Sequence, residues 1–301
     1  MSDTLEHLRR KISSATELQS VVRTMKALAA ANIGQYEQSV RALSDYYHTV
    51  ELGLHVCSRY LAPAALLTRK TKQTAVVSAA VVFGSDQGLV GRFNEEVADY
   101  AVKTLAALPP GKLQVWAVGE RVYSHLMDAD LPLMGVFNVP TSVKAITALV
   151  GRILVESETL LSQQDATELH LFYNRPAGSI YGPVCQRLLP LDEQWLGTLA
   201  DQSWPTGNLP EVIGDRAATL RALIREYLFV SLFRACAESL ASENSSRLAA
   251  MQRADQNIDE LLENFHSAFH QLRQSGIDEE LFDVISGYEA LAKEKSRRGS
   301  Q

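Results

Sequence analysis

Two long amphipathic segments occupy the two ends of the chain. From Leu5 to Leu54 apolar side chains recur at steps of three and four residues, and the first proline is Pro63. This spacing predicts one helix with a continuous apolar stripe, far longer than the mean globular helix of about a dozen residues. The same pattern returns from Leu220 to Leu272. Two such stripes bury one another most simply as an antiparallel coiled coil.

Between these segments the pattern changes to short β-branched runs that alternate with amphipathic stretches. Segments rich in Gly, Pro and Asn at 174–182 and 203–214 are predicted loops. Alternating strands and helices are typical of a mainly parallel sheet with helices on its faces. The predicted fold class is therefore α/β, with a Rossmann-like central domain joined to a long coiled coil. The predicted strands are 75–83, 112–118, 133–139, 168–173 and 183–189, and the predicted helices are 94–108 and 142–162.

This reading divides the chain into three predicted parts. Residues 1–60 and 210–291 form the antiparallel coiled-coil shaft, 72–200 form the α/β domain, and 292–301 form a short tail. We expect the second shaft helix to be longer by roughly 20 residues, or about 30 Å at 1.5 Å per residue. Its last turns should then project without a helical partner and look apolar.

Composition narrows the functional classes. A hydrophobic content of 46% excludes a disordered chain, and a net charge of −6 with a pI near 5.7 argues against a general nucleic-acid binder. Cys57, Cys185 and Cys236 are far apart and odd in number, which indicates free thiols in a reducing compartment. We see no signal-peptide pattern and no apolar stretch near the ~20 residues that a membrane span requires. The expected location is cytosolic, without direct insertion into a membrane.

One loop has the position of a phosphate-binding loop. Gly84, Gly88 and Gly91 follow a predicted strand and open a predicted helix, which is where such loops lie. Their spacing matches neither GxGxxG nor GxxxxGK[ST], and no lysine follows the last glycine. A tight strand-to-helix turn is a sufficient structural reason for these glycines. We therefore expect no cofactor, and a small nucleotide-binding or redox enzyme remains the alternative.

Two sequence pairs resemble halves of a carboxylate di-iron site. They are Asp45-x-x-His48 and Glu263-x-x-His266. In an antiparallel helix pair His48 faces about residue 220, so His266 is on the order of 65 Å away at 1.5 Å per residue. One metal cluster cannot use both, and solvated or interface histidines are the simpler reading. No HExxH and no recognisable Ser–His–Asp context occurs either, so we expect neither a metal site nor a catalytic site.

The first helix carries a basic cluster with few acidic neighbours. From residue type alone, the cluster is most simply a polar helix face exposed to solvent. The functional alternative is a cationic collar that faces an acidic partner. The cluster consists of Arg9, Arg10, Lys11, Arg23 and Lys26.

Five segments, in order along the chain, resemble motifs of one protein family. They are residues 8–14 (LRRKISS), 19–31 (QSVVRTMKALAAA), 85–91 (SDQGLVG), 238–251 (ESLASENSSRLAAM) and 273–281 (RQSGIDEEL). Each is similar to a stretch of the γ subunit of F-type ATP synthases, the rotating central shaft. The segment 238–251 is the most specific of the five. The resemblance runs from Leu5 to about Leu291.

Several positions depart from the family pattern. The chain has Asn32 after the alanine run instead of Lys, Gln87 instead of Arg, Arg92 instead of the second Gly of GLCGG, and Asp278 instead of Thr. These differences indicate a divergent γ subunit, as expected from a second, alternative ATP synthase operon. The regulatory insert of plants and cyanobacteria, with its cysteine pair, is absent, so thiol switching of that kind is not expected.

The resemblance implies a function that agrees with the pattern of the chain. A γ subunit is not itself catalytic: its shaft stands inside a ring of α and β subunits, and its α/β domain contacts the ε subunit and the membrane-embedded c-ring. The implied location is the cytoplasmic face of the bacterial inner membrane, as a peripheral protein. The sequence leaves open whether protons or sodium ions are translocated. A non-rotary, homodimeric coiled-coil scaffold is the second alternative.

The resemblance also implies contact residues. By motif matching, Arg247, Arg273 and Gln274 fall at family positions that bond to loops of the ring, whereas by residue type both arginines are ordinary solvated helix residues. On that basis we expect alanine at either arginine to leave the fold intact. Met25, with Arg23 and Lys26, falls where the first helix passes an acidic lever of a β subunit. Its spacing from Val22 and Ala29 equally permits Met25 simply to fill the apolar stripe.

Overall fold

The computed structural model describes residues 2–60, 77–109, 111–163, 168–177, 180–191, 204, 207–208 and 210–298. These residues form two compact units, one of residues 28–248 and the other of residues 1–27 with 249–301. Two helices contribute to both units. They are α1, Ser2–Tyr60, and α7, Arg216–Arg298.

A five-stranded sheet is the centre of the unit of residues 28–248. Its strand order is β3-β2-β1-β4-β5. The first four strands of this order are mutually parallel, and β5 runs antiparallel to β4. The predicted α/β class with a mainly parallel sheet is thus confirmed. The strands are β1 Val77–Phe83, β2 Lys112–Val118, β3 Leu133–Phe137, β4 Glu168–Ala177 and β5 Ile180–Leu189.

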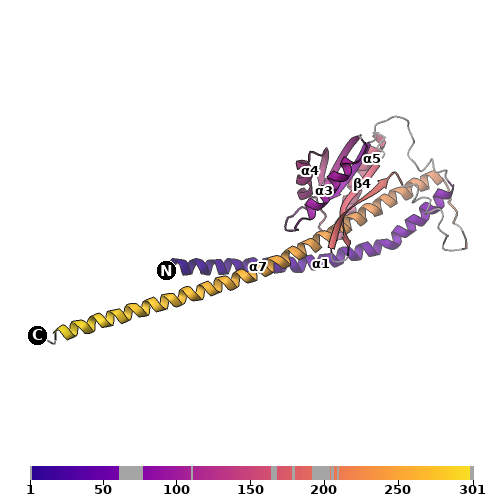
Figure 1. Cartoon of the computed structure of the whole chain (residues 1–301). Coiled ribbons are helices and arrows are strands. Elements are labelled where there is room, and N and C mark those ends of the chain that lie inside the picture. Colours follow the sequence, from indigo (N-terminus) through magenta and orange to yellow (C-terminus); the bar gives the residue numbers. More distant parts are fainter. Residues whose placement is uncertain are drawn as a thin grey trace. The chain divides into compact units, whose positions relative to one another are not determined.

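Helices cover both faces of this sheet (Figure 1). On one face Ala80 and Val82 of β1 pack in a cluster with α3, Phe93–Ala106, and α4, Glu120–Asp128. On the other face Ala79, Val81 and Phe83 join a larger cluster with α5, Val143–Gln163, and with the shaft helices. Every residue of β1 is buried, which explains why this strand is continuously apolar rather than alternating.

The two shaft helices run antiparallel within this unit. Asn32 of α1 contacts Asn244 of α7, and fourteen residues further along α1 the Tyr46 hydroxyl donates to Glu226. The Tyr47 and Tyr227 rings pack with their centroids 6.0 Å apart. Partner numbers fall along α7 as they rise along α1, as the predicted coiled coil requires.

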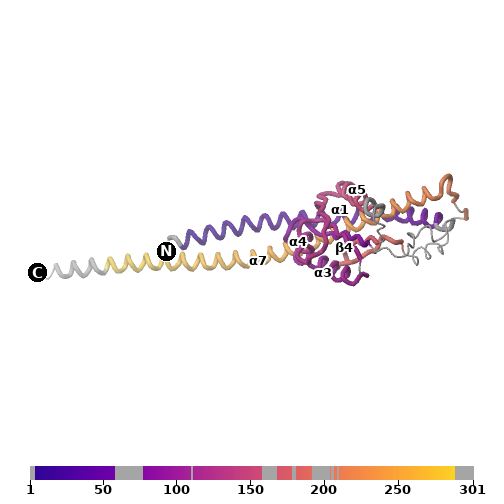
Figure 2. The backbone as a smooth tube through the Cα atoms, turned by 90° about the horizontal axis from the view of Figure 1, so that it is seen from above, coloured from indigo at the N-terminus to yellow at the C-terminus, as the bar shows by residue number. Residues whose placement is uncertain are grey.

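The unit of residues 1–27 and 249–301 is a pair of helical segments with a small core. Val22 of α1 is buried with Met251 and Ile258 of α7. Pairing is again antiparallel, so both chain termini lie at the same end of this unit, and α7 continues past the first turn of α1 (Figure 2). The predicted difference in helix length is confirmed, because α1 has 59 residues and α7 has 83.

The structure differs from the predicted elements in three places. Most of the predicted loop 174–182 belongs to the arms of a β4–β5 hairpin, where prolines are tolerated because β5 is an edge strand and β4 has passed the last residue paired with β1. Helix α4 was not predicted, since it has nine residues and buries only Val122 and Leu126. Finally, α7 continues through residues 292–298, where a tail was expected.

Some predictions fall on residues outside the described ranges. They are the first two residues of the predicted strand 75–83, the flanks of the α/β domain at 72–76 and 192–200, and residues 203, 205, 206 and 209 of the predicted loop 203–214. No helix within the described ranges is both long and apolar enough to cross a membrane.

Candidate functional site

The loop after β1 is closed by the protein's own backbone and side chains. The Gly84 N–H donates to the Val118 carbonyl at 2.8 Å, joining the ends of β1 and β2. A Cβ at Gly84 would lie 2.3 Å from the Val122 Cβ and 2.7 Å from the Asn94 Oδ1, so only glycine fits. Gly119 has φ +110°, a conformation that favours glycine, and a Cβ there would lie 2.7 Å from the Ser85 carbonyl carbon. Close packing therefore accounts for glycine at both positions without a bound ligand.

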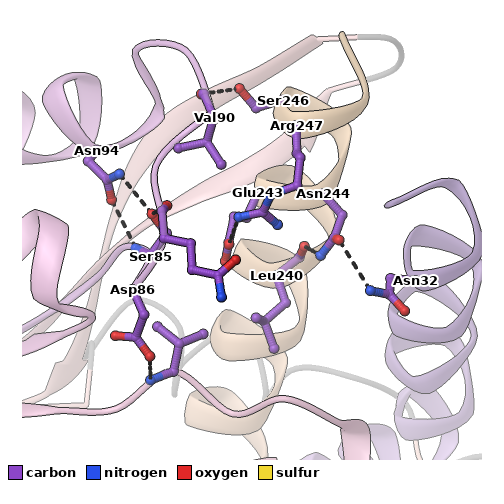
Figure 3. Close-up of polar contacts among 12 residues, drawn as sticks. Asn32, Ser85, Asp86, Val90, Asn94, Leu240, Glu243, Asn244, Ser246 and Arg247 are labelled. Atoms are coloured by element: carbon purple, nitrogen blue, oxygen red, sulfur yellow. Dashed lines mark hydrogen bonds and ion pairs between the residues drawn. The ribbon is translucent and has the colours of Figure 1, made fainter. Parts of the chain in front are cut away.

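Polar side chains complete this closure (Figure 3). The Ser85 N–H donates to Asn94 Oδ1 at 2.9 Å, and Asn94 Nδ2 donates back to Ser85 Oγ at 2.8 Å. The Asp86 carboxylate accepts from the N–H groups of Glu120 at 3.1 Å and Val139 at 2.9 Å. Asp86 therefore holds the start of α4, the place where a bound anion would be stabilised.

A small hollow of about 360 Å³ lies beside this loop. Its lining includes the cationic Arg121, the carboxylate Glu95 and the ring of His125. Both signs of charge are present, so the hollow has no clear preference for phosphate.

The loop is fastened to α7 by the segment 242–247. Ser246 Oγ donates to the Val90 carbonyl (Figure 3) and lies 3.2 Å from the Tyr181 hydroxyl. Ser242 Oγ donates to the Asn174 carbonyl at 3.0 Å, and Asn174 Nδ2 donates to the Phe93 carbonyl at 2.9 Å. Polar residues of this segment are thus buried because they bond to the loop and to β4.

Arg247 lies inside this seam rather than on the surface. Its side chain is 13% exposed, and its Nη2 pairs at 2.6 Å with Glu243, which is 8% exposed. Burial raises the pKa of Glu243, and the nearby Arg247 guanidinium partly offsets that rise. The interpretation of Arg247 as a solvated helix residue was wrong.

A second buried carboxylate holds the hairpin against α7. Glu238 accepts from Arg175 Nε of β4 at 2.9 Å and from Arg234 Nε at 2.7 Å. Arg175 also donates to the Tyr173 hydroxyl, and burial raises the pKa of Tyr173 to about 12. Glu238 stands in the motif segment 238–251, but nothing in the sequence indicated Arg175 as its partner, because the two are 63 residues apart.

In the other unit, two of the predicted contact residues pair with α7. Asp255 accepts from Arg23 Nε at 3.0 Å and from Lys26 Nζ at 2.9 Å, and the hydrogen bonds from Lys26 and Arg23 hold its pKa below the ordinary value. Gln19 and Arg23 also reach Asp259. Arg23 and Lys26 remain 57% and 37% exposed, so each still presents charge to the outside.

Other members of the basic cluster lie over aromatic rings. The Arg9 guanidinium is 5.4 Å from the centre of the Phe269 ring, and Lys11 Nζ is 5.8 Å from that of Phe265. These distances are typical of cation–π contacts. The cluster is therefore partly a helix-pairing device, which neither of the two sequence interpretations had included.

Met25 is half-buried and packs against the cluster of Val22, Met251 and Ile258. It therefore fills the apolar stripe, and whether it also touches a partner stays a prediction. Arg273 and Gln274 are exposed.

Of the two pairs that resemble di-iron halves, only the helix pairing around His48 can be compared with the expected position. Tyr47 packs against Tyr227, so the residue opposite His48 lies about one to two turns from the expected position near 220. Within the described ranges, no three His, Cys, Asp or Glu side chains are grouped in a way that could bind a metal ion.

Comparisons with known proteins identify the family of this fold. The family model described as ATP synthase matches residues 4–291. The chain belongs to the ATP synthase γ-chain family. It is 29% identical over 304 residues to the ATP synthase gamma chain of Salinibacter ruber, covering 95% of this chain and 98% of the relative. It is 27% identical over 318 residues to the gamma chain of Cyanothece, with 95% and 99% covered.

Solved structures with the same fold include chains of large ATP synthase assemblies. A chain of the Euglena gracilis mitochondrial ATP synthase, in a structure of OSCP, F1 and c-ring, superposes with a TM-score of 0.64 at 17% identity, covering 98% of this chain and 97% of that one. A chain of the rotor of the same enzyme gives 0.60 at 16% identity, covering 92% and 100%. This γ chain thus has the fold of both over nearly its whole length.

Proposed function

We propose that this γ chain is the central rotary shaft of a proton- or sodium-translocating F-type ATP synthase. Its rotation couples ion movement to the conformational cycle of the catalytic β subunits. The main support is the C-terminal end of α7, which is apolar and uncovered in the described part of the chain. Leu281, Phe282, Val284 and Tyr288 are 56%, 69%, 68% and 75% exposed.

Such a helix end needs an apolar environment. Exposed apolar patches on soluble proteins mark interaction surfaces, and an isolated helical projection has little stability without packing partners. A sleeve formed by α and β subunits supplies that environment. The helix then turns inside a collar that keeps water from its apolar side chains.

Coupling follows from the asymmetry of a shaft made of two unlike helices. Each β subunit meets a different face of α1 and α7, and each face favours a different β conformation. Rotation changes which subunit meets which face, so the conformational equilibria shift in turn. Bond making and breaking belong to the nucleotide sites of the ring, and this subunit has no catalytic site of its own.

The α/β domain completes the set of partners. In this proposal it contacts the ε subunit and the membrane-embedded c-ring, and the complex holds the chain at the cytoplasmic face of the bacterial inner membrane as a peripheral subunit. Neither nucleic acid nor a bound cofactor has a part in this function.

The contact residues keep their proposed roles with one revision. Exposed Arg273 and Gln274 bond to loops of the ring, because a guanidinium fork suits a carboxylate there. Arg23 and Lys26 face the acidic lever while Asp255 holds them. Arg247 acts differently: its pair with Glu243 lies within α7 and compensates for burial of both groups, and its influence on the ring is indirect.

Co-expression with the α and β subunits tests this proposal. We expect the full chain to co-purify with both, and Arg273→Ala with Gln274→Ala to weaken that association or the coupled turnover. Lys103→Ala, an exposed change on α3, is the matched control and should behave as wild type. Normal assembly, ATP hydrolysis and ion pumping in the double variant would refute the roles of Arg273 and Gln274.

Two alternatives make different predictions. A nucleotide-binding enzyme would bind ATP, ADP, NAD or FMN with micromolar affinity in calorimetry and lose that binding in Gly88→Val. The structure favours the shaft over this alternative, because Asp86 already caps the start of α4, where a phosphate would be stabilised. A non-rotary scaffold would self-associate through its stripes and ignore α and β subunits, which light scattering and co-purification measure together.

A further inference from the structure

Three side chains that the shaft function does not use meet at the edge of the sheet. They are Glu168 and His170 of β4 and Cys185 of β5. His170 Nε2 lies 3.1 Å from Glu168 Oε2, and Cys185 Sγ lies 3.8 Å from His170 Nδ1. The strand register explains this, because Cys185 is directly opposite Phe172 and therefore diagonal to His170 across the antiparallel pair.

The bonding pattern fixes the roles of the two ring nitrogens. An ionised carboxylate only accepts hydrogen bonds, so Nε2 of the neutral His170 ring carries the proton that Glu168 accepts. Nδ1 is then the basic nitrogen, and it faces the Cys185 thiol. Ser78 Oγ also donates to Glu168, at 3.4 Å, which holds the carboxylate in place. Cys185 is thus placed as a nucleophile, His170 as its base and Glu168 as the group that orients the base.

The surroundings keep the thiol protonated at rest. Burial raises the pKa of Cys185 above its ordinary value of 9.0, so little thiolate is present at neutral pH without help from a base. Cys185 is only half-buried, whereas His170 is 6% exposed. Two further charged or titratable side chains face this group: Arg187 is opposite His170 in the strand register, and Tyr100 of α3 packs on Phe172.

The charge beside the thiol selects a class of reagent. Arg187 is exposed and lies two residues from Cys185 on β5, hence on the same face of the strand. A guanidinium in that position attracts an anionic reagent and repels a cationic one. Glutathione disulfide is a small disulfide that carries net negative charge.

We propose that Cys185, His170 and Glu168 form a thiol-exchange site, at which small anionic disulfides attach to Cys185. In the reaction Sγ attacks one sulfur of the disulfide while its proton moves to His170 Nδ1. The Sγ–S bond forms as the S–S bond of the reagent breaks, and the released thiolate takes the proton from His170. Cys185 is oxidised to a mixed disulfide, and the other half of the reagent is reduced to a thiol.

The other two cysteines provide internal references. Cys57 and Cys236 are 2% and 1% exposed, and burial raises the pKa of both thiols. For neither does the structure give a hydrogen bond to a histidine within the described residues. The three thiols of one chain therefore differ in access and in the presence of a base.

The experiment treats the folded full chain with glutathione disulfide and quantifies each cysteine by peptide mass spectrometry. We expect Cys185 to react at least about tenfold faster than Cys57 and Cys236. His170→Asn should slow the reaction at neutral pH by about a hundredfold, the lower end of the range for general acid–base catalysis. His125→Asn, an exposed histidine on α4, is the matched control and should change nothing.

The pH profile of the wild-type chain is a second readout that needs no variant. In the wild-type chain the rate should rise with pH below the range in which the thiol ionises, because His170 acts as the base, and in His170→Asn only where the thiol itself ionises. Cystamine, a cationic disulfide, should react more slowly than glutathione disulfide, and Arg187→Glu should reverse that order. Equal rates for the three cysteines, or a wild-type profile that rises only at thiol ionisation, would overturn the proposal.

Discussion

Two arginines of α7 lie in opposite environments, although residue type alone makes them equivalent. Arg247 is 13% exposed and paired with a buried glutamate, whereas Arg273 is exposed. Arg247 Nε has no hydrogen-bond partner within the described residues. The ion pair with Glu243 is therefore the main interaction that offsets the cost of burying the guanidinium. A buried ion pair costs much to break by removing one member.

We predict that Arg247→Ala destabilises the chain by about 3–5 kcal/mol, because it leaves the Glu243 charge buried without a partner. Arg273→Ala should change the free energy of unfolding by no more than about 0.5 kcal/mol. Urea unfolding of the full chain measures both. Replacing Arg247 and Glu243 together by methionine should recover much of the loss, since no uncompensated charge remains. A small effect of Arg247→Ala alone would show that the pair is not a structural element.

Met25 permits a test at the level of function. In a rotary shaft a flexible, uncharged side chain adapts to a moving partner without forming a directional bond. We predict that Met25→Lys gives a complex that assembles and hydrolyses ATP but pumps few ions per ATP. The added cation, next to Arg23 and Lys26, strengthens one rotary position through a further ion pair with an acidic partner.

The matched control is Met25→Leu, because Met25 also packs against Val22 and Met251. Leucine retains the apolar packing and should pump normally. If Met25 only fills the stripe, the two variants will differ in thermal stability and share one ratio of pumping to hydrolysis. That outcome would remove the contact hypothesis and leave the fold unaffected.

At the scale of elements, the helix pair of residues 1–27 and 249–301 depends on polar contacts more than on its core. Its buried apolar cluster has three members, Val22, Met251 and Ile258. Asp255 lies next to them and receives hydrogen bonds from both Arg23 and Lys26. This pairing also fixes the register, since a shift of one residue would separate the three charges.

We predict that Asp255→Asn destabilises this pair at pH 7 and that the loss disappears in acid. The pKa of Asp255 is lower in the folded chain than its ordinary 3.8. Its stabilising contribution is therefore complete above that ordinary value and is lost as the pH falls toward the folded pKa. Urea unfolding at several values between pH 7 and pH 2 should show the two chains converging below about pH 4. Asp283→Asn, an exposed change on α7, should show no such convergence.

At the scale of the whole molecule, the last turns of α7 contribute little to the fold of the isolated chain. Ile277, Leu281 and Phe282 are more than half exposed, and the pairing of Arg9 with Phe269 leaves few α1 residues to cover them. Their apolar character is needed only when a partner surrounds them.

We predict that removing residues 277–301 leaves the free energy of unfolding of the chain unchanged within about 0.5 kcal/mol. The truncated chain should associate more weakly with α and β subunits in co-purification. A full-length variant with serine at Phe282 and Tyr288 separates apolar contact from helix length and should weaken association in the same direction. Loss of stability on truncation would mean that these turns pack within the chain itself.

Much of the architecture was predictable because its signals are local and repeated. The stripes from Leu5 to Leu54 and from Leu220 to Leu272 extend over many turns, so single exceptions do not obscure the helical period. The strand β1 and the second half of β2 are almost continuously apolar because helices bury both of their faces. The motif segment 238–251 was recognisable as a string of residues whatever its environment.

Tertiary structure alone decided which polar groups face the interior. Arg175 meets Glu238, Arg23 and Lys26 meet Asp255, and Cys185 meets His170, each across a separation that no local pattern encodes. The sequence by itself determined two long helices, a mainly parallel sheet between them and membership of a family. It could not determine the burial of Arg247, because one helical residue becomes core or surface according to what folds against it.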